Sequence, residues 1–329
     1  MEMMKKELLQ VERMNIRFHT ERGTFRAVKD VSFTLKRNEI VGLVGESGCG
    51  KSVTSQALIG LLPSNAECTA ERLQFEEAPL GEFDERAWLD LRGNRMAMIF
   101  QEPLTTLNPL LTVGRQISEG LIRHQRLTKK QAKERALQVM RQVELPRPEQ
   151  LYDEYPHQLS GGMRQRIVIA MALVCNPQLL IADEPTTALD VTVQANIIAL
   201  LKEIHAKQQT SILFISHDLA VIFDLCQRII VMYAGYIVEE ADKSSLQRLQ
   251  RHPYTKALIG SLPSAAKRGQ PLQAIPGSVP SIQEELLGCP FAPRCSKADE
   301  RCRNELPELV EICPGHFVRC HYADREAIQ

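Results

Sequence analysis

A glycine-rich segment directly after an apolar run constrains this chain more than any other feature. Residues 45–52 read Gly-Glu-Ser-Gly-Cys-Gly-Lys-Ser and match the phosphate-binding pattern G-x4-G-K-[ST]. Such glycines let backbone N–H groups face phosphate oxygens, while Lys51 supplies a charge and Ser52 a hydroxyl for Mg²⁺. The apolar residues 40–44 before the loop and the helical pattern of residues 53–62 after it predict a strand and a helix N-terminus, where anions bind. The residues predicted to contact phosphate are Gly45, Ser47, Gly48, Cys49, Gly50, Lys51, Ser52 and Val53.

An acidic pair ends a second apolar run. Asp183 and Glu184 follow residues 179–182, which read Leu-Leu-Ile-Ala. Ligands of open α/β sheets bind at the carboxyl ends of the strands. Asp183 can therefore hold Mg²⁺, and Glu184 is placed to polarise an attacking water. By itself such a pair is more often solvated, but after a phosphate-binding loop it predicts hydrolysis of a bound nucleotide.

Composition limits the class of protein further. No apolar run approaches the ~18–20 residues of a membrane-spanning helix, and residues 1–7 lack the apolar segment of a signal peptide. We therefore expect a cytosolic chain that reaches a membrane only through partner proteins. Lys+Arg and Asp+Glu number 40 each, and this balance argues against a dedicated nucleic-acid-binding protein.

A second pair of glycines begins another predicted helix. Residues 159–163 read Leu-Ser-Gly-Gly-Met, and apolar residues at helical spacing follow. With this motif the chain resembles the ATP-binding-cassette (ABC) ATPases, whose signature is LSGGQ-like; Met163 stands where Gln is commonest. The resemblance covers residues 8 to about 240. It implies that Ser160, Gly161 and Gly162 cap the γ-phosphate of ATP bound in the other subunit of a head-to-tail dimer.

The other motifs of the ABC family follow in order. The resemblance implies that Gln101 senses Mg²⁺ and a transmembrane partner, that Asp190 belongs to the D-loop, and that His217 contacts the γ-phosphate. Phe18 matches the aromatic residue that stacks on adenine, with Phe25 as a rival. The expected catalytic residues are Glu184, His217 and Gln101, and the expected Mg²⁺ ligands are Ser52, Gln101 and Asp183.

The expected fold is α/β. Apolar runs at residues 40–44, 179–182 and 212–215, with helical segments between them, predict a mostly parallel buried sheet. With the resemblance, this implies a P-loop NTPase (RecA-like) core with an N-terminal antiparallel β subdomain. We expect an inserted helical subdomain over about residues 104–175, which includes a charged helix at 129–143. The ABC domain is expected to span residues 1–240, and a small Cys-rich C-terminal extension residues 241–329.

Cysteines gather near the C-terminus. Five of the nine lie in the last 41 residues: Cys289, Cys295, Cys302, Cys313 and Cys320. In a cytosolic protein such clustering favours metal or redox chemistry over disulfides. The gaps of five, six and seventeen residues that separate Cys289, Cys295, Cys302 and Cys320 differ from the short C-x2-C knuckles of zinc ribbons. An iron–sulfur cluster, a zinc site and packed reduced thiols all remain compatible with this pattern.

The same region narrows the resemblance. Residues 252–255 (His-Pro-Tyr-Thr), 275–277 (Ile-Pro-Gly) and 288–295 resemble the C-terminal extension of peptide/nickel importer ATPases. Cys289, Cys295, Cys302 and Cys320 match four cysteines that ligate a [4Fe–4S] cluster in some members, so we favour the cluster over zinc. Cys313 departs from this set.

The resemblance implies an ATPase subunit of an ABC importer. ATP and Mg²⁺ are its expected ligands, and di- or oligopeptides or a related small solute its cargo. Expected partners are a paralogous ATPase subunit in a heterodimer, two transmembrane permeases and an extracytoplasmic solute-binding protein, with no nucleic acid. The chain would lie peripherally on the cytoplasmic face of the inner membrane. Rival interpretations are a soluble ABC ATPase acting on nucleic acid or ribosomes, and an iron–sulfur sensor that binds ATP.

Overall fold

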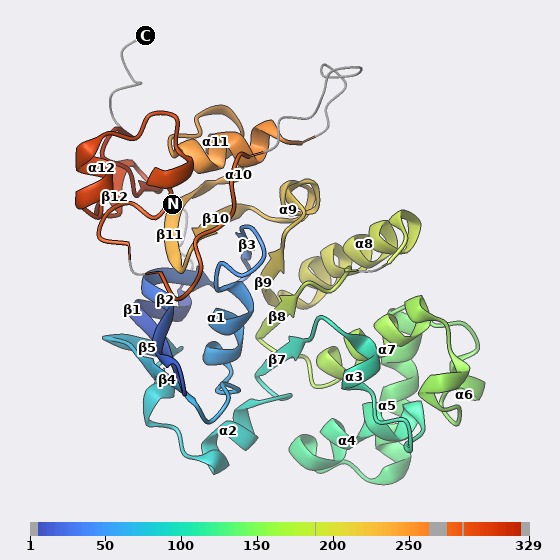
Figure 1. Ribbon diagram of the computed structural model, residues 1–329. Helices are drawn as coiled ribbons and strands as arrows, with labels where there is room; N and C mark the ends of the chain where they lie inside the picture. The colour runs from blue at the N-terminus through green and yellow to red at the C-terminus, as the bar shows by residue number, and fades with distance from the viewer. Residues whose placement is uncertain (1–5, 188, 263–274, 285, 324–329) are drawn as a thin grey trace. The chain divides into compact units, whose positions relative to one another are not determined.

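The computed structural model describes residues 6–187, 189–262, 275–284 and 286–323 (Figure 1). Two compact units make up the chain, and each draws on separated stretches of sequence. One contains residues 1–8, 35–39 and 82–215, and the other residues 9–34, 40–81 and 216–329. Residues 1–5, and residues 263–274, 285 and 324–329 of the expected C-terminal extension, lie outside the described parts.

The second unit opens with an antiparallel sheet. Strand β1 (Glu7–Thr20) pairs with β4 (Ala66–Thr69) and β5 (Arg72–Phe75), and β6 (Ala78–Pro79) pairs with β5. Strand β2 (Gly23–Lys36) lies on the other side of β1. The short 3-10 helix η1 (Leu80–Glu82) follows β6.

The two long strands each change face at a residue with positive φ. In β1, Val11 and Met14 are both buried because Arg13 (φ 51°) interrupts the alternation between them. In β2, Asp30 (φ 50°) does the same between Val28 and Val31. An inserted residue of this kind is the mark of a β-bulge, which shifts every later side chain to the other face.

A second sheet of this unit carries the glycine-rich loop. Strand β3 (Ile40–Val44), fully buried, runs parallel to β10 (Arg228–Tyr233), and β11 (Tyr236–Asp242) pairs antiparallel with β10. The C-terminal part of the chain extends this sheet, because β13 (His316–Val318) pairs with β11, and β12 (Val310–Cys313) pairs with β13. The helices of the unit are α1 (Lys51–Leu58), α9 (Leu219–Leu225), α10 (Lys243–Arg248), α11 (Pro253–Gly260), the 3-10 helix η4 (Ala292–Arg294) and α12 (Glu300–Asn304).

The first unit contains three parallel strands. Strand β8 (Leu179–Asp183) lies between β7 (Met96–Ile99) and β9 (Ser211–Ser216), with Ile181 opposite both Met98 and Leu213. All their residues are buried, as continuous apolar runs predict for a parallel sheet. The helix α8 (Val191–Gln208) connects β8 to β9.

The remaining helices of this unit precede β8 in the chain, and those that lie between β7 and β8 gather beside one another in Figure 1. They are α2 (Glu85–Leu91), just before β7, then α3 (Pro103–Thr106), α4 (Val113–Gln125), α5 (Lys129–Gln142), α6 (Pro148–Leu151), the 3-10 helix η2 (Pro156–Gln158) and α7 (Gly161–Leu173). The charged helix expected at 129–143 is confirmed as α5. Thr128 and Gln131 form a capping box at its start, and Ala132, Ala136 and Met140 are fully buried.

Within the described part of the chain, no helix has both the length and the apolar character needed to span a bilayer. The helix expected at 53–62 is displaced: α1 begins at Lys51 and ends at Leu58, since Gly60 adopts a positive φ of 66°.

Candidate functional site

The glycine-rich loop joins β3 to α1 as the sequence predicts. Gly48 (φ 80°) and Gly50 (φ 104°) adopt the left-handed conformations that glycine tolerates best, and Gly50 is the N-cap of α1. Lys51 is 5% exposed, and its ammonium donates hydrogen bonds to the carbonyl oxygens of Gly45 (2.8 Å) and Glu46 (3.0 Å). The loop therefore curls around the lysine that begins the helix.

The loop is packed tightly against the strand β10. A Cβ atom at Gly45 would lie 2.1 Å from the carbonyl oxygen of Met232 and 2.7 Å from Sγ of Cys49. Cys49 is fully buried, and burial raises the pKa of its thiol, so the sulfur packs as a neutral group. The predicted loop residue Cys49 thus contributes its backbone, not a reactive side chain, to the loop surface.

Phe18 and His217 belong to the same unit as the loop. Phe18 lies on β1 opposite Ala66 of β4 and is half-buried, as is the rival Phe25 on β2. His217 is exposed and follows directly after β9. The next residue, Asp218, caps α9 by accepting a hydrogen bond from the N–H of Ala220 (2.9 Å).

The acidic pair belongs to the other unit and is held by several hydrogen bonds. Asp183 ends β8 and is 3% exposed. Glu184 adopts a left-handed conformation (φ 48°), and its N–H donates to the carbonyl of Ile215 (2.9 Å). Its carboxylate Oε2 accepts from Nε2 of Gln101 (3.2 Å) and from Oγ1 of Thr187 (2.9 Å). The structure thus brings together Gln101 and Glu184, two residues that the sequence assigned separately.

Thr187 is a site residue that the sequence analysis missed. It lies three residues after Glu184, and its N–H also donates to the Glu184 carbonyl (3.2 Å). A threonine at the close of a tight turn is the available signal, because its hydroxyl can reach back to the residue that opens the turn. The positive φ of Glu184, at the start of this turn, is uncommon for a residue other than glycine and tends to occur at functional sites.

The signature segment forms the start of α7. Ser160 is the N-cap and accepts a hydrogen bond from the N–H of Met163 (3.4 Å). A side chain at Gly161 would meet nothing within 4 Å, whereas one at Gly162 would lie 3.2 Å from Val193 of α8. Asp190 caps α8 through the N–H of Val193 (2.9 Å). The N-termini of α7 and α8 are therefore neighbours. Ala188, two residues before Asp190, lies outside the described residues.

The four expected cluster ligands line one cavity of about 730 Å³, whereas Cys313 lies exposed on β12. Nevertheless, the described residues include no group of three or more His, Cys, Asp or Glu side chains placed to share a metal ion. The structure therefore contradicts the prediction that Cys289, Cys295, Cys302 and Cys320 bind a [4Fe–4S] cluster, since matching spacing did not place their sulfur atoms at one point.

Comparison with known proteins agrees with the motifs. The family described as "ABC transporter" matches residues 28–187, and "Oligopeptide/dipeptide transporter, C-terminal region" matches residues 238–302. A peptide ABC transporter ATP-binding protein of Sinorhizobium fredii is 49% identical over 95% of this chain and 94% of its own length. The dipeptide transport ATP-binding protein DppD of Escherichia coli is 46% identical over 96% of each chain.

A solved structure supports the fold. It is a dimeric post-hydrolysis state of an ATP-binding cassette bound to ADP and phosphate, with a TM-score of 0.64 and 27% identity over 72% of this chain and 99% of its own. The chain is therefore an ATP-hydrolysing protein with the ABC cassette fold. It belongs to the ATP-binding proteins of ABC transporters, in the group with the oligopeptide/dipeptide transporter C-terminal region.

We predict that Gly45→Ala destabilises the chain by at least about 3 kcal/mol, because the added methyl group meets a backbone carbonyl that cannot rotate away. Gly48→Ala is the matched control. A side chain at Gly48 meets nothing within 4 Å, so only its positive φ is strained, at a cost of about 1–2 kcal/mol. Urea-induced unfolding of both variants compares the two costs. A loss at Gly45 no larger than that at Gly48 would contradict the crowding described above.

Proposed function

We propose that this chain is the ATP-hydrolysing subunit of an importer for di- or oligopeptides or a related small solute. The observation that carries the proposal is the combination, in one chain, of an ABC cassette with the oligopeptide/dipeptide C-terminal region, matched over nearly the full length of the relatives. ATP hydrolysis alone, without the cargo, already follows from membership of the ABC transporter family.

We propose a role for each of the site residues. The loop amides from Gly45 to Val53 and the Lys51 ammonium bind the phosphates, and Phe18 stacks on adenine. Mg²⁺ suits Asp183 and Ser52, because both offer the hard oxygen ligands that the ion prefers; Gln101 offers a third oxygen. Bound Mg²⁺ would neutralise charge on the phosphates, which is the main requirement of phosphoryl transfer.

Glu184 is the proposed general base. Hydrogen bonds from Gln101 and Thr187 to one of its carboxylate oxygens fix the orientation of the group. A carboxylate held in this way can accept a proton from water as the water attacks the γ-phosphorus, which releases ADP and phosphate. His217, exposed at the end of β9, would contact the γ-phosphate.

The signature segment is proposed to serve ATP bound in a partner subunit. Ser160 and Gly161 are exposed at the N-terminus of a thirteen-residue helix, where the helix dipole favours an anion. The open space at Gly161 leaves room for a ligand from outside the chain. A solved relative of this fold is a dimer bound to ADP and phosphate, which agrees with such an arrangement.

Partners and organisation follow from the same family. We propose a heterodimer with a paralogous ATPase subunit, bound to two transmembrane permeases that receive solute from an extracytoplasmic binding protein. The chain would lie peripherally on the cytoplasmic face of the inner membrane. Residues 1–240 would form the cassette, with helices α3–α7 as its inserted helical part, and residues 241–329 the C-terminal extension. The antiparallel sheet of β1, β2, β4, β5 and β6 would be its β subdomain.

Isolation from the native membrane and reconstitution test the proposal. The tagged chain is purified from solubilised membranes, and the complex is placed in liposomes that enclose ATP. We expect co-purified permeases and uptake of a radiolabelled dipeptide that depends on ATP and on the binding protein. A chain recovered only with ribosomes or nucleic acid would instead favour the soluble ABC ATPase.

We predict that Glu184→Gln slows ATP hydrolysis by the assembled complex at least about 100-fold, the effect of losing a positioned general base, while ATP binding persists. Thr187→Val removes only one hydrogen bond to the carboxylate, and we expect a loss of roughly 10-fold or less. Steady-state phosphate release and binding of a fluorescent ATP analogue separate the two effects. Near wild-type turnover in Glu184→Gln would assign the base elsewhere.

We predict that Gly161→Asp abolishes turnover of the assembled complex, although the chain still folds and binds ATP. A Cβ atom at Gly161 meets nothing within 4 Å, so the substitution fits the chain, but the new carboxylate repels phosphate at the helix N-terminus. Gly81→Asp is the control, since Gly81 is also exposed and surrounded by open space. Loss of ATP binding by the isolated Gly161→Asp chain would contradict a site shared with a partner.

A further inference from the structure

One residue of the phosphate-binding loop, Glu46, is held from three directions. Its N–H donates to the hydroxyl oxygen of Tyr254 (2.9 Å), and its carbonyl accepts from the Lys51 ammonium (3.0 Å). Its carboxylate forms a bidentate ion pair with Arg294: Oε2 accepts from Nη1 (2.5 Å) and Oε1 accepts from Nη2 (3.1 Å). Tyr254 and Arg294 both belong to the C-terminal part of the chain, so two of the three contacts come from outside the cassette motifs.

Arg294 is built into this position. Its side chain is 4% exposed, and it makes five hydrogen bonds, matching the five N–H donors of a guanidinium. Besides Glu46, the acceptors are the hydroxyl of Tyr233 and the carbonyls of Ile275 and Pro276. The hydrogen bond to Glu46 raises the pKa of Arg294 further above its usual value, so the group stays charged. A guanidinium with every donor engaged has a single orientation.

A cluster of three aromatic rings packs next to the Glu46–Arg294 ion pair. The rings of Tyr233 and Tyr254 lie 4.6 Å apart, and Phe291 lies 5.2 Å from the first and 5.4 Å from the second. The Arg294 guanidinium lies 5.9 Å from the Phe291 ring. Tyr233 follows Met232, whose carbonyl limits the space at Gly45. The cluster thus connects the C-terminal part of the chain to the strand that supports the loop.

We propose that Arg294 is a positioning residue of the phosphate-binding loop: together with Tyr254 it fixes Glu46, and through the Glu46 carbonyl it fixes Lys51. The C-terminal part of the chain therefore sets the nucleotide affinity of the cassette. The inference rests on the proposed binding of ATP by the loop and not on the proposed peptide cargo.

A purely electrostatic role and a purely anchoring role for Arg294 would give different results. If Arg294 only neutralised Glu46, then Glu46→Gln would remove a negative charge near the phosphates and would tighten ATP binding. If Arg294 only anchored the C-terminal part, then loss of any other contact that anchors this part would change the affinity for ATP equally. A positioning role requires that Glu46→Gln weaken binding, because the amide cannot accept both guanidinium bonds, and that anchors elsewhere leave the affinity unchanged.

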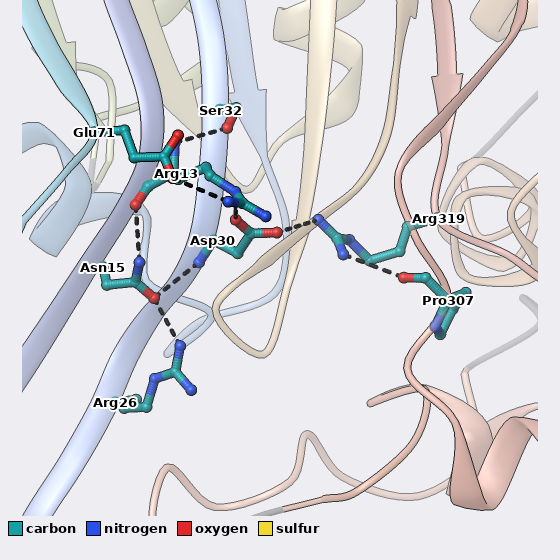
Figure 2. A network of polar contacts seen from close by, with 8 residues as sticks. All are labelled: Arg13, Asn15, Arg26, Asp30, Ser32, Glu71, Pro307 and Arg319. Atoms are coloured by element: carbon teal, nitrogen blue, oxygen red, sulfur yellow. Dashed lines mark hydrogen bonds and ion pairs between the residues drawn. The ribbon is translucent and has the colours of Figure 1, made fainter.

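The chain supplies a second buried arginine that anchors the C-terminal part away from the loop. Arg319, also with a 4% exposed side chain, lies 3.6 Å from the Asp30 carboxylate and donates to the Pro307 carbonyl (3.2 Å), as Figure 2 shows. Asp30 belongs to β2 and contacts Arg13 in the same network (Figure 2). Asp30→Asn therefore weakens an ion pair to the C-terminal part at a strand, whereas Glu46→Gln weakens one at the loop.

The test measures the Kd for Mg·ATP of the full chain with a fluorescent ATP analogue. We expect Glu46→Gln to raise Kd by about 3- to 10-fold and Arg294→Met by about 10-fold or more, because the first variant keeps one guanidinium bond and the second removes both. The double variant should bind no more weakly than Arg294→Met alone, and Asp30→Asn should change Kd less than about 2-fold. Hydrogen exchange of residues 45–51 should accelerate in Glu46→Gln, Arg294→Met and the double variant, but not in Asp30→Asn.

Three outcomes would overturn the proposal. Tighter ATP binding by Glu46→Gln would show that Arg294 acts by charge alone. An equal rise in Kd with Asp30→Asn would show a general anchoring effect. Wild-type Kd in both Glu46→Gln and Arg294→Met would show that the loop needs no support from the C-terminal part. Glu46→Gln keeps the test valid if Arg294→Met does not fold, because it preserves the shape of the side chain.

Discussion

The close approach of Gly45 to the Met232 carbonyl is the contact on which the site depends. The parallel ladder pairs Ile230 with Leu43 and Val231 with Val44, so the next residues along each strand are Met232 and Gly45. The ladder register therefore fixes where the loop leaves the sheet. Only glycine fits at that point, and the curl that follows brings two carbonyls to the Lys51 ammonium. A shift of one residue in the ladder would remove this arrangement entirely.

The C-terminal part of the chain is built on the neighbouring strand. Strand β11 pairs with β10 and also with β13, and its residue Glu239 is fully buried. Burial acts to raise the pKa of Glu239, but hydrogen bonds from His316 and from the N–H groups of Arg251 and His252 outweigh it, so the pKa is lowered. A charged carboxylate with several donors ties together segments that are far apart in the sequence. This buried junction stabilises the sheet next to the strand that supports the loop.

Local patterns predicted the parts of the fold that depend on neighbouring residues. The runs at 40–44, 179–182 and 212–215 are strands because every residue is apolar and buried on both faces, and the periodicity of 129–143 gave a helix within one residue of its bounds. The hairpin of β12 and β13 is too short to show a period, and it was missed. The cysteine spacing was misleading for a related reason: spacing along a loop does not determine whether four side chains converge.

The Glu46–Arg294 pair is the clearest case of a feature beyond local patterns, because its partners are 248 residues apart. From the loop sequence alone, a glutamate at position 46 would be expected to weaken phosphate binding, because its negative charge repels the anion. Likewise, Arg294 reads as a surface charge when the C-terminal segment is considered alone. Removing either partner leaves the other without its counter-charge in a largely buried position, which is more costly than removing both. The loop and the C-terminal segment therefore constrain each other's sequence and act as one structural feature.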